Sequence, residues 1–141
     1  MSNTSLFGES LDDAGKLLLR LTLGVLLLFH GWDKVVSGVA DIVVTLQESG
    51  FPGVMAYGVY LGEIVAPLLI LAGVFTRPAA LLYAGSVLFA SLLVHAVDYT
   101  QLARSGGYGG ELYIFYVAGG IAVALLGAGR YSLRGGRGAW D

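Results

Sequence analysis

Residues 16–34 read KLLLRLTLGVLLLFHGWDK, and this stretch decides the fold class. It is almost unbroken apolar sequence, but Arg20 lies inside it and His30 stands near its end. A run of about 20 mostly apolar residues is long enough to cross the hydrocarbon core of a bilayer as one helix. The stretch therefore predicts a transmembrane helix that carries an ionisable group near each end.

The composition of the whole chain is typical of an integral membrane protein. Of its 141 residues, 56% are hydrophobic and 13% are charged, whereas charged residues make up about 25% of a soluble domain. The 22 glycines suit helices that pack closely in a membrane. The net charge of -2 and the lack of a long basic run argue against a nucleic-acid partner. The absence of cysteine excludes disulfides, iron–sulfur clusters and thiol catalysis.

Four segments are long and apolar enough to be spans, namely residues 17–32, 54–75, 78–97 and 112–128. Helices are expected because each satisfies its own backbone groups in lipid. Residues 39–50 have apolar side chains on one helical face and predict a short helix that lies along the membrane surface. The fold class predicted is all-α integral membrane: a four-transmembrane-helix bundle with a short interfacial helix after the first span.

The chain divides into a polar amino-terminal segment (1–15), a four-helix transmembrane domain (16–130) and a basic tail (131–141). Six Lys and Arg residues fall on the side of both termini and two on the opposite side. The positive-inside rule then places both termini in the cytoplasm of a bacterial or archaeal inner membrane. The first run is interpreted as a retained span, because the first positive charge is Lys16 and the apolar run is too long for a secretory signal.

Polar groups recur at similar depths in the predicted spans. With a rise of about 1.5 Å per residue, His30, His95 and Glu111 lie roughly 7–13 Å above the bilayer centre. Glu63 falls near the midplane, where a carboxylate costs roughly 2.5–3.5 kcal/mol and needs a partner or a proton. Small residues on the same helix faces indicate that these groups point inward, away from lipid.

The residues leave the role of each group open. Arg20 either snorkels to the membrane surface or pairs with Glu63, and Glu63 is either that structural partner or a functional proton site. Each histidine taken alone is typical of an interfacial hydrogen-bonding group, and Glu111 also suits the first turn of a helix. The tyrosines, Tyr60 among them, are typical of an outer aromatic belt.

Taken together, the groups favour one of two kinds of site. Two histidines and a carboxylate are ligands that a transition metal accepts, but their spacing matches no local metal motif. Alternatively, imidazoles and carboxylates bind a quinone head group and pass protons. No catalytic residue is assigned, because the chain has no nucleophile motif and no dinucleotide fingerprint. The candidate ligand-binding or proton-handling residues are His30, Glu63, His95, Glu111, Arg20, Lys34 and Tyr60, and the weak metal candidates are His30, His95 and Glu111.

The chain also resembles the DoxX family of small four-span bacterial and archaeal membrane proteins. The stretches that carry the resemblance span residues 17–133; they are Leu18-Leu19-Arg20, His30-Gly31 with Lys34, Gly50-Phe51-Pro52, Gly62-Glu63, TRPAA at 76–80, His95, GYGGE at 107–111 and GAGRYSL at 127–133. The resemblance implies an inner-membrane four-helix bundle. Because the family takes its name from a subunit of a thiosulfate:quinone oxidoreductase, it also implies contact with quinone or a redox partner protein. The acidic start and the tail after Leu133 match nothing in the family pattern.

Three functional hypotheses follow. The first is a membrane subunit of a redox system that contacts quinone or a redox partner through a polar pocket on the periplasmic half. The second is a non-catalytic scaffold that anchors a partner protein through residues 39–53. The third is a small-molecule or proton transporter, because Glu63 and Pro67 place a protonatable group beside a helix bend. Membrane lipid is a partner in all three, and the glycine ridges allow a homo-oligomer.

Overall fold

The computed structural model describes residues 3–95, 99–102 and 106–141, and over these residues it contains helices, loops and one isolated bridge between Leu102 and Tyr108. The elements in chain order are α1 (Asn3–Ser37), α2 (Ala40–Glu48), η1 (Gly53–Gly58), η2 (Leu61–Val65), α3 (Ala66–Ala72), α4 (Thr76–Phe89), η3 (Ala90–Val94) and α5 (Glu111–Leu126). The η1 segment is a 3₁₀ helix, and η2 and η3 are single π-helical segments that continue into α3 and out of α4. The all-α prediction is confirmed for the described residues.

Three helical stretches within the described residues are long and apolar enough to cross a membrane: Gly8–Ser37, Gly53–Ala72 and Thr76–Val94. They correspond to the first three predicted spans. The fourth predicted span forms the apolar helix α5, which has 16 residues and is shorter than the other three. The short helix expected after the first span is present as α2. Residues 3–15 belong to the same helix as the first span, because α1 begins at Asn3.

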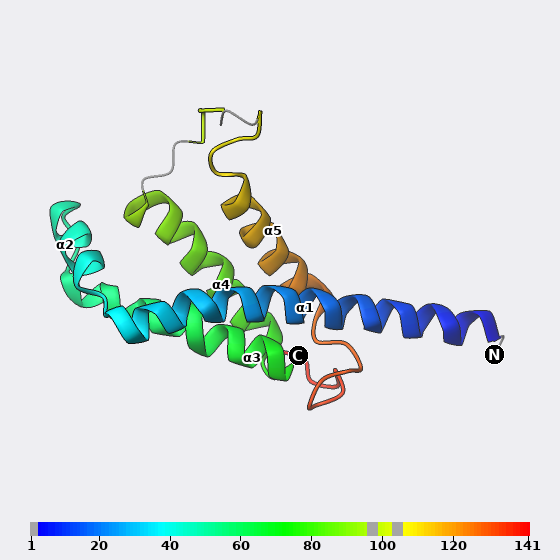
Figure 1. The fold of residues 1–141 in the computed structure, drawn as a ribbon. Coiled ribbons are helices and arrows are strands. Elements are labelled where there is room, and N and C mark those ends of the chain that lie inside the picture. Colours follow the sequence, from blue (N-terminus) through cyan, green and yellow to red (C-terminus); the bar gives the residue numbers. More distant parts are fainter. Residues whose placement is uncertain (1–2, 96–98, 103–105) are drawn as a thin grey trace.

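The helices pack in two layers that cross each other. Figure 1 shows α1 running through the whole length of the molecule with α3 alongside it, while α4 and α5 lie side by side and rise away at an angle. The core is formed where the layers cross, by Leu23 and Leu27 of α1, Ile70 of α3, Tyr83 of α4 and Val123 of α5. Burying this apolar surface between helices excludes lipid and fixes their crossing.

A second, smaller core holds α2 against the ends of its neighbours. Val39, Leu46 and Ala56 are buried there, with Phe89 of α4 packed against them. Gly38 and Gly50 flank α2, and both have a positive φ, 80° and 82°. This left-handed backbone is readily adopted by glycine and lets the chain turn sharply into and out of α2.

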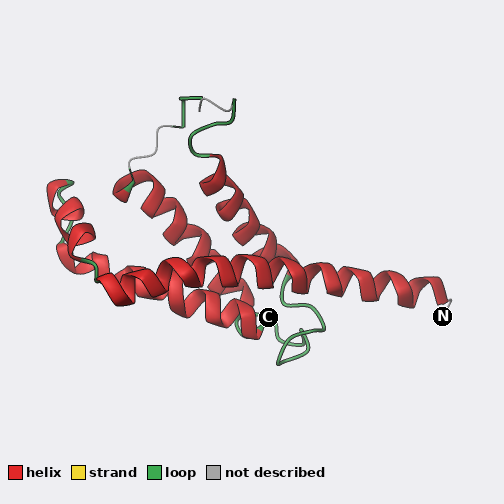
Figure 2. Ribbon diagram, in the orientation of Figure 1, coloured by secondary structure: helices red, strands yellow, loops and turns green. Residues whose placement is uncertain are grey.

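The opposite end of the bundle is closed by the segment after α5, which is a loop that folds back along the helices (Figure 2). Leu133 N donates to Ala72 O at the end of α3, at 3.0 Å. The carboxylate of Asp141, which is 4% exposed, accepts from Phe75 N at 3.0 Å. The tail is therefore packed against the junction between α3 and α4.

Two arginines tie this end together. Arg77 donates from Nη1 to the carbonyls of Ala124 and Leu125, at 3.1 and 3.2 Å, and from Nε to the main-chain oxygen of Asp141 at 3.1 Å. These contacts satisfy carbonyls of the last turn of α5, which have no partner within their own helix. Arg20 does the same for α3, and its contacts are described with the candidate site residues below.

Candidate functional site

Glu63 is the centre of the candidate site, and the local sequence explains its irregular backbone. Pro67 follows four residues later and has no N–H, so the carbonyl of Glu63 loses the partner that a regular α-helix would provide. The chain forms the π-helical segment η2 at this point, and such segments are frequent at functional sites. The Glu63 side chain is 9% exposed, and its Oε2 has no hydrogen-bond partner among the described residues.

A glycine brings α1 up against this segment. A Cβ atom on Gly31 would overlap the carbonyl oxygen of Glu63 and would come within 2.7 Å of the Ile64 side chain. Only a residue without a side chain permits this approach of two helices. Gly31 therefore places the end of the first span directly beside Glu63.

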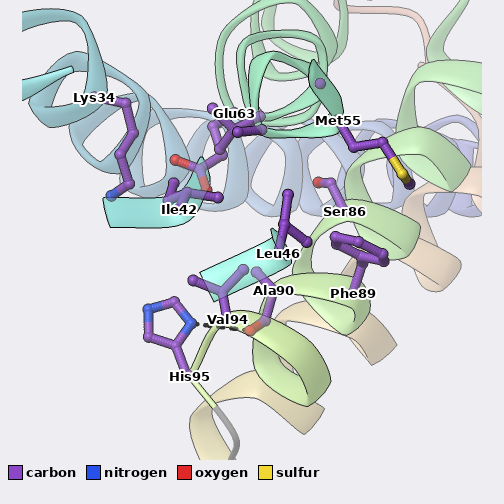
Figure 3. A pocket seen from close by; sticks show the side chains of 13 residues that line it. Lys34, Ile42, Leu46, Met55, Glu63, Ser86, Phe89, Ala90, Val94 and His95 are labelled. Atoms are coloured by element: carbon purple, nitrogen blue, oxygen red, sulfur yellow. Dashed lines mark hydrogen bonds between the residues drawn. The ribbon is translucent and has the colours of Figure 1, made fainter. Parts of the chain in front are cut away.

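A cavity of about 320 Å³ opens on one side of Glu63 and is mainly apolar. Its walls are formed by Lys34, Ile42, Leu46, Met55, Ala56, Gly58, Val59, Glu63, Ser86, Phe89, Ala90, Val94 and His95. Figure 3 shows the side chains of Lys34 and Glu63 reaching toward the same end of this cavity, with His95 across from them and Ile42 and Val94 between. We call it the large cavity.

A second cavity of about 90 Å³ also has Glu63 in its wall. It is lined by Leu27, His30, Lys34, Glu63, Val87, Ala90, His95, Leu112, Tyr113 and Tyr116. Lys34, Glu63, Ala90 and His95 therefore belong to the walls of both cavities. We call this second space the small cavity.

The two histidines stand at the exposed edge of the small cavity, each beside a tyrosine of α5. The ring of His30 meets that of Tyr116 edge-on with centroids 6.5 Å apart, and the ring of His95 lies 5.6 Å from that of Tyr113. His95 Nδ1 is 3.1 Å from Ala90 O. Because a carbonyl only accepts, this hydrogen bond requires a proton on Nδ1.

Charge near Glu63 comes from the end of α1. Lys34 and Asp33 are the charged residues that interact electrostatically with the Glu63 carboxyl group. The Lys34 ammonium is 3.5 Å from the Asp33 carboxylate, and both carboxylates thus lie near one cation. Tyr60 supports this arrangement, because its hydroxyl donates to Lys34 O at 3.0 Å.

Arg20 has a different role from either one predicted. It is 1% exposed, and its guanidinium donates to main-chain carbonyls only: Nε to Ile70 at 3.0 Å, Nη2 to Leu71 and Tyr131 at 3.1 and 3.2 Å, and Nη1 to Ala128. It neither snorkels nor pairs with Glu63. The ion pairs found over the described residues join Lys16 with Asp12, Lys34 with Asp33 and Arg134 with Asp141. Arg20 binds the last turn of α3 to the segment after α5.

Glu111 is the other predicted site residue that the structure does not place beside His30, Glu63 and His95. It is exposed, it lines neither cavity, and its carboxylate lies against the backbone of Gly107. Over the described residues, no three His, Cys, Asp or Glu side chains gather closely enough to hold a metal ion. The metal set of His30, His95 and Glu111 is therefore not assembled.

The sequence did not identify most of the wall of the large cavity. Ile42 and Leu46 come from α2 and carry no signal beyond an apolar face. Ser86 also gave no signal of a site. A serine in an apolar helix often donates to a backbone carbonyl of its own helix, and the Ser86 hydroxyl donates to Tyr83 O at 2.9 Å. Gly62 packs directly against this serine, because a Cβ atom there would overlap the Ser86 side chain.

Comparison with known proteins shows the family. The DoxX family model matches residues 15–96, more than half of the chain, and this range includes every candidate residue except Glu111. The chain is similar to the inner membrane protein YqjF of Escherichia coli, with 32% identity over 89% of this chain and 93% of that protein. It is also similar to an uncharacterized protein of Haemophilus influenzae, with 27% identity over 82% of this chain and 84% of that protein. No solved structure matches. This chain is a member of the DoxX family and, like its Escherichia coli relative, an inner membrane protein.

Proposed function

We propose that the protein crosses the inner membrane four times, with α5 as the fourth span and α2 at the membrane surface. The support for the fourth span is the exposed face of α5, where Leu112, Phe115 and Leu125 are 61%, 79% and 73% exposed. A surface of large apolar side chains is stable against lipid and not against water. At about 1.5 Å per residue, α5 is about 24 Å long, and a thinner or locally adapted bilayer accommodates it.

The excess of Lys and Arg at the end that holds both termini favours a cytoplasmic location for that end. The lack of native cysteine permits a direct test with single cysteines. We expect Ser49→Cys, next to α2, to react with a membrane-impermeant maleimide in intact cells after the outer membrane is permeabilised. Leu133→Cys, in the tail, should react only after lysis. The reverse pattern would show the opposite orientation.

We propose that the large cavity binds the head group of a quinone and that the protein is a membrane subunit of a redox system. The observation that carries this proposal is an unpartnered, buried carboxyl oxygen on Glu63 at the wall of a mainly apolar cavity. The volume of about 320 Å³ lies in the range of small-molecule sites, about 300–1,000 Å³. The family resemblance to a quinone-linked subunit points in the same direction.

The donors and walls of the large cavity fit a quinone ring. The ring is flat and apolar, and its two carbonyl oxygens accept hydrogen bonds. Lys34 and a protonated Glu63 offer donors at one end of the cavity, while Leu46 and Phe89 provide apolar contact. A bound quinone would supply two-electron redox chemistry, and the residues of this chain would hold and orient it.

Binding of a short-chain quinone to the purified protein in detergent tests this proposal by calorimetry or thermal stabilisation. Val94→Phe places a ring in the large cavity, and we expect it to abolish binding. Leu92→Phe is the matched control on the same segment, because Leu92 is 53% exposed and lines neither cavity. Failure of the wild type to bind, or equal binding by Val94→Phe, would refute the quinone site.

A further inference from the structure

We propose that the small cavity is a hydrated proton path that connects Glu63 with the end of the bundle where His30 and His95 are exposed. The inference rests on the quinone site proposed above and assigns a separate task to the neighbouring space. Glu63 would exchange its proton through the small cavity while it faces the ligand in the large one.

The first argument is that Glu63 lines both cavities. Among the described residues it is the carboxyl group that lines both. The large cavity is closed in mainly by apolar side chains, which conduct no protons. His30, Tyr113 and Tyr116 line the small cavity and not the large one, whereas His95 and Lys34 line both. A proton that reaches Glu63 from outside the bundle therefore has more polar neighbours along the small cavity.

The second argument is that the small cavity suits water. A water molecule takes about 30 Å³ in the liquid and needs two to four polar partners. The volume of about 90 Å³ holds up to about three such molecules. The unpartnered Oε2 of Glu63 is one partner, and the hydroxyls of Tyr113 and Tyr116 and the imidazoles are others. Ordered water would thus satisfy a carboxyl oxygen that the protein itself leaves without a hydrogen bond.

The titratable and charged groups around Glu63 come from three helical elements. Helix α1 contributes His30, Asp33 and Lys34, and His95 stands at the end of η3. Helix α5 contributes the two tyrosines, and α2 contributes only apolar walls to the neighbouring large cavity. The two imidazoles are exposed and carry ring nitrogens that both donate and accept protons, so they are suited to exchange protons with water.

The proposed step moves one proton and no electrons. A hydronium ion in the small cavity transfers its proton to the Glu63 carboxylate, which leaves a neutral water and a carboxylic acid. The hydroxyl of that acid is then the donor that faces a quinone carbonyl in the large cavity. Deprotonation runs through the same waters in reverse.

Infrared difference spectroscopy of quinone binding, followed by transfer into D₂O, tests the path. We expect quinone to perturb a carboxylic acid C=O band that is absent in Glu63→Gln and that shifts rapidly in D₂O. Val87→Phe fills the small cavity without touching the large one. This variant should retain quinone binding. The rate at which the C=O band shifts after transfer into D₂O should fall at least about ten-fold, a modest effect for a positioned proton-transfer group.

His30→Gln provides a second variant that does not depend on core packing. His30 is exposed and lines only the small cavity, so the protein should fold and bind quinone normally. We expect the same slowing of the deuterium shift as in Val87→Phe. If quinone binds and the shift is as fast in both variants as in the wild type, the proton path is refuted and the quinone site stands. If quinone does not bind to the wild type, the quinone site fails and the path loses its purpose.

Discussion

Replacing Arg20 with methionine is expected to destabilise the bundle strongly, although this residue lines neither cavity. The guanidinium is buried and holds four carbonyls from two distant parts of the chain. Methionine has a similar length and fits an apolar helix, so the change removes hydrogen bonds with little change in volume. The carbonyls of Leu71, Ala128 and Tyr131 then lose this donor.

The size of the effect follows from these contacts. Ile70 O also accepts from Gly73 N at 3.2 Å and keeps a partner. The other three acceptors each lose a bond to a charged donor, at about 1.5 kcal/mol per bond. The free energy of unfolding regains about 2 kcal/mol, because the variant no longer buries a charge. The net loss is about 2–3 kcal/mol, which lowers Tm by roughly 8–12 °C in a chain of this size.

Thermal unfolding in detergent, followed by circular dichroism, measures this loss. Arg20→Lys should fall between the wild type and Arg20→Met, because an ammonium lacks the planar fork that reaches several carbonyls. Arg137→Met is the matched control, because Arg137 is exposed and its side chain makes no hydrogen bond among the described residues. A Tm for Arg20→Met within about 2 °C of the wild type would show that the carbonyl contacts do not hold this end together.

Three glycine substitutions test the packing around the site. Gly31→Ala drives a methyl group into the Glu63 carbonyl and should cost about 1–3 kcal/mol of stability and weaken quinone binding; an unchanged melting curve would contradict the close approach. Gly62→Ala should cost a similar amount through its overlap with Ser86, and Ser86→Gly in the same chain should recover most of the loss in circular dichroism melts. Gly85→Ala meets nothing within 4 Å and should instead stabilise α4 by about 0.5–1 kcal/mol, measured in the same way.

The span pattern was predictable because a bilayer imposes length and hydropathy together. The predicted spans at 54–75 and 78–97 therefore lie close to the helical stretches Gly53–Ala72 and Thr76–Val94. The extension of α1 to Asn3 carried no such signal, since a helix outside the apolar region needs no hydrophobic run. The π-helical segments were also unpredictable, because they shift the register of a helix without a characteristic residue pattern.

The candidate site was partly predictable from depth and helical face. These two properties placed His30, Glu63 and His95 near one another, and the structure does bring them together. They failed for Glu111, because its position depends on the course of the loop before α5, and hydropathy contains no information on that course. They failed for Arg20 because its partners are backbone carbonyls, which every residue has and which no side-chain pattern can identify.

The contacts of Arg20 also bear on the order in which the protein is made. A chain is synthesised and inserted from its amino terminus, so the first span enters the membrane long before residues 128–131 exist. Until those residues leave the ribosome, the guanidinium has only the acceptors at the end of α3. The nascent helices therefore assemble with a cation that still lacks part of its hydrogen-bond partners, and Ala128 and Tyr131 supply these partners only after α5 has been made.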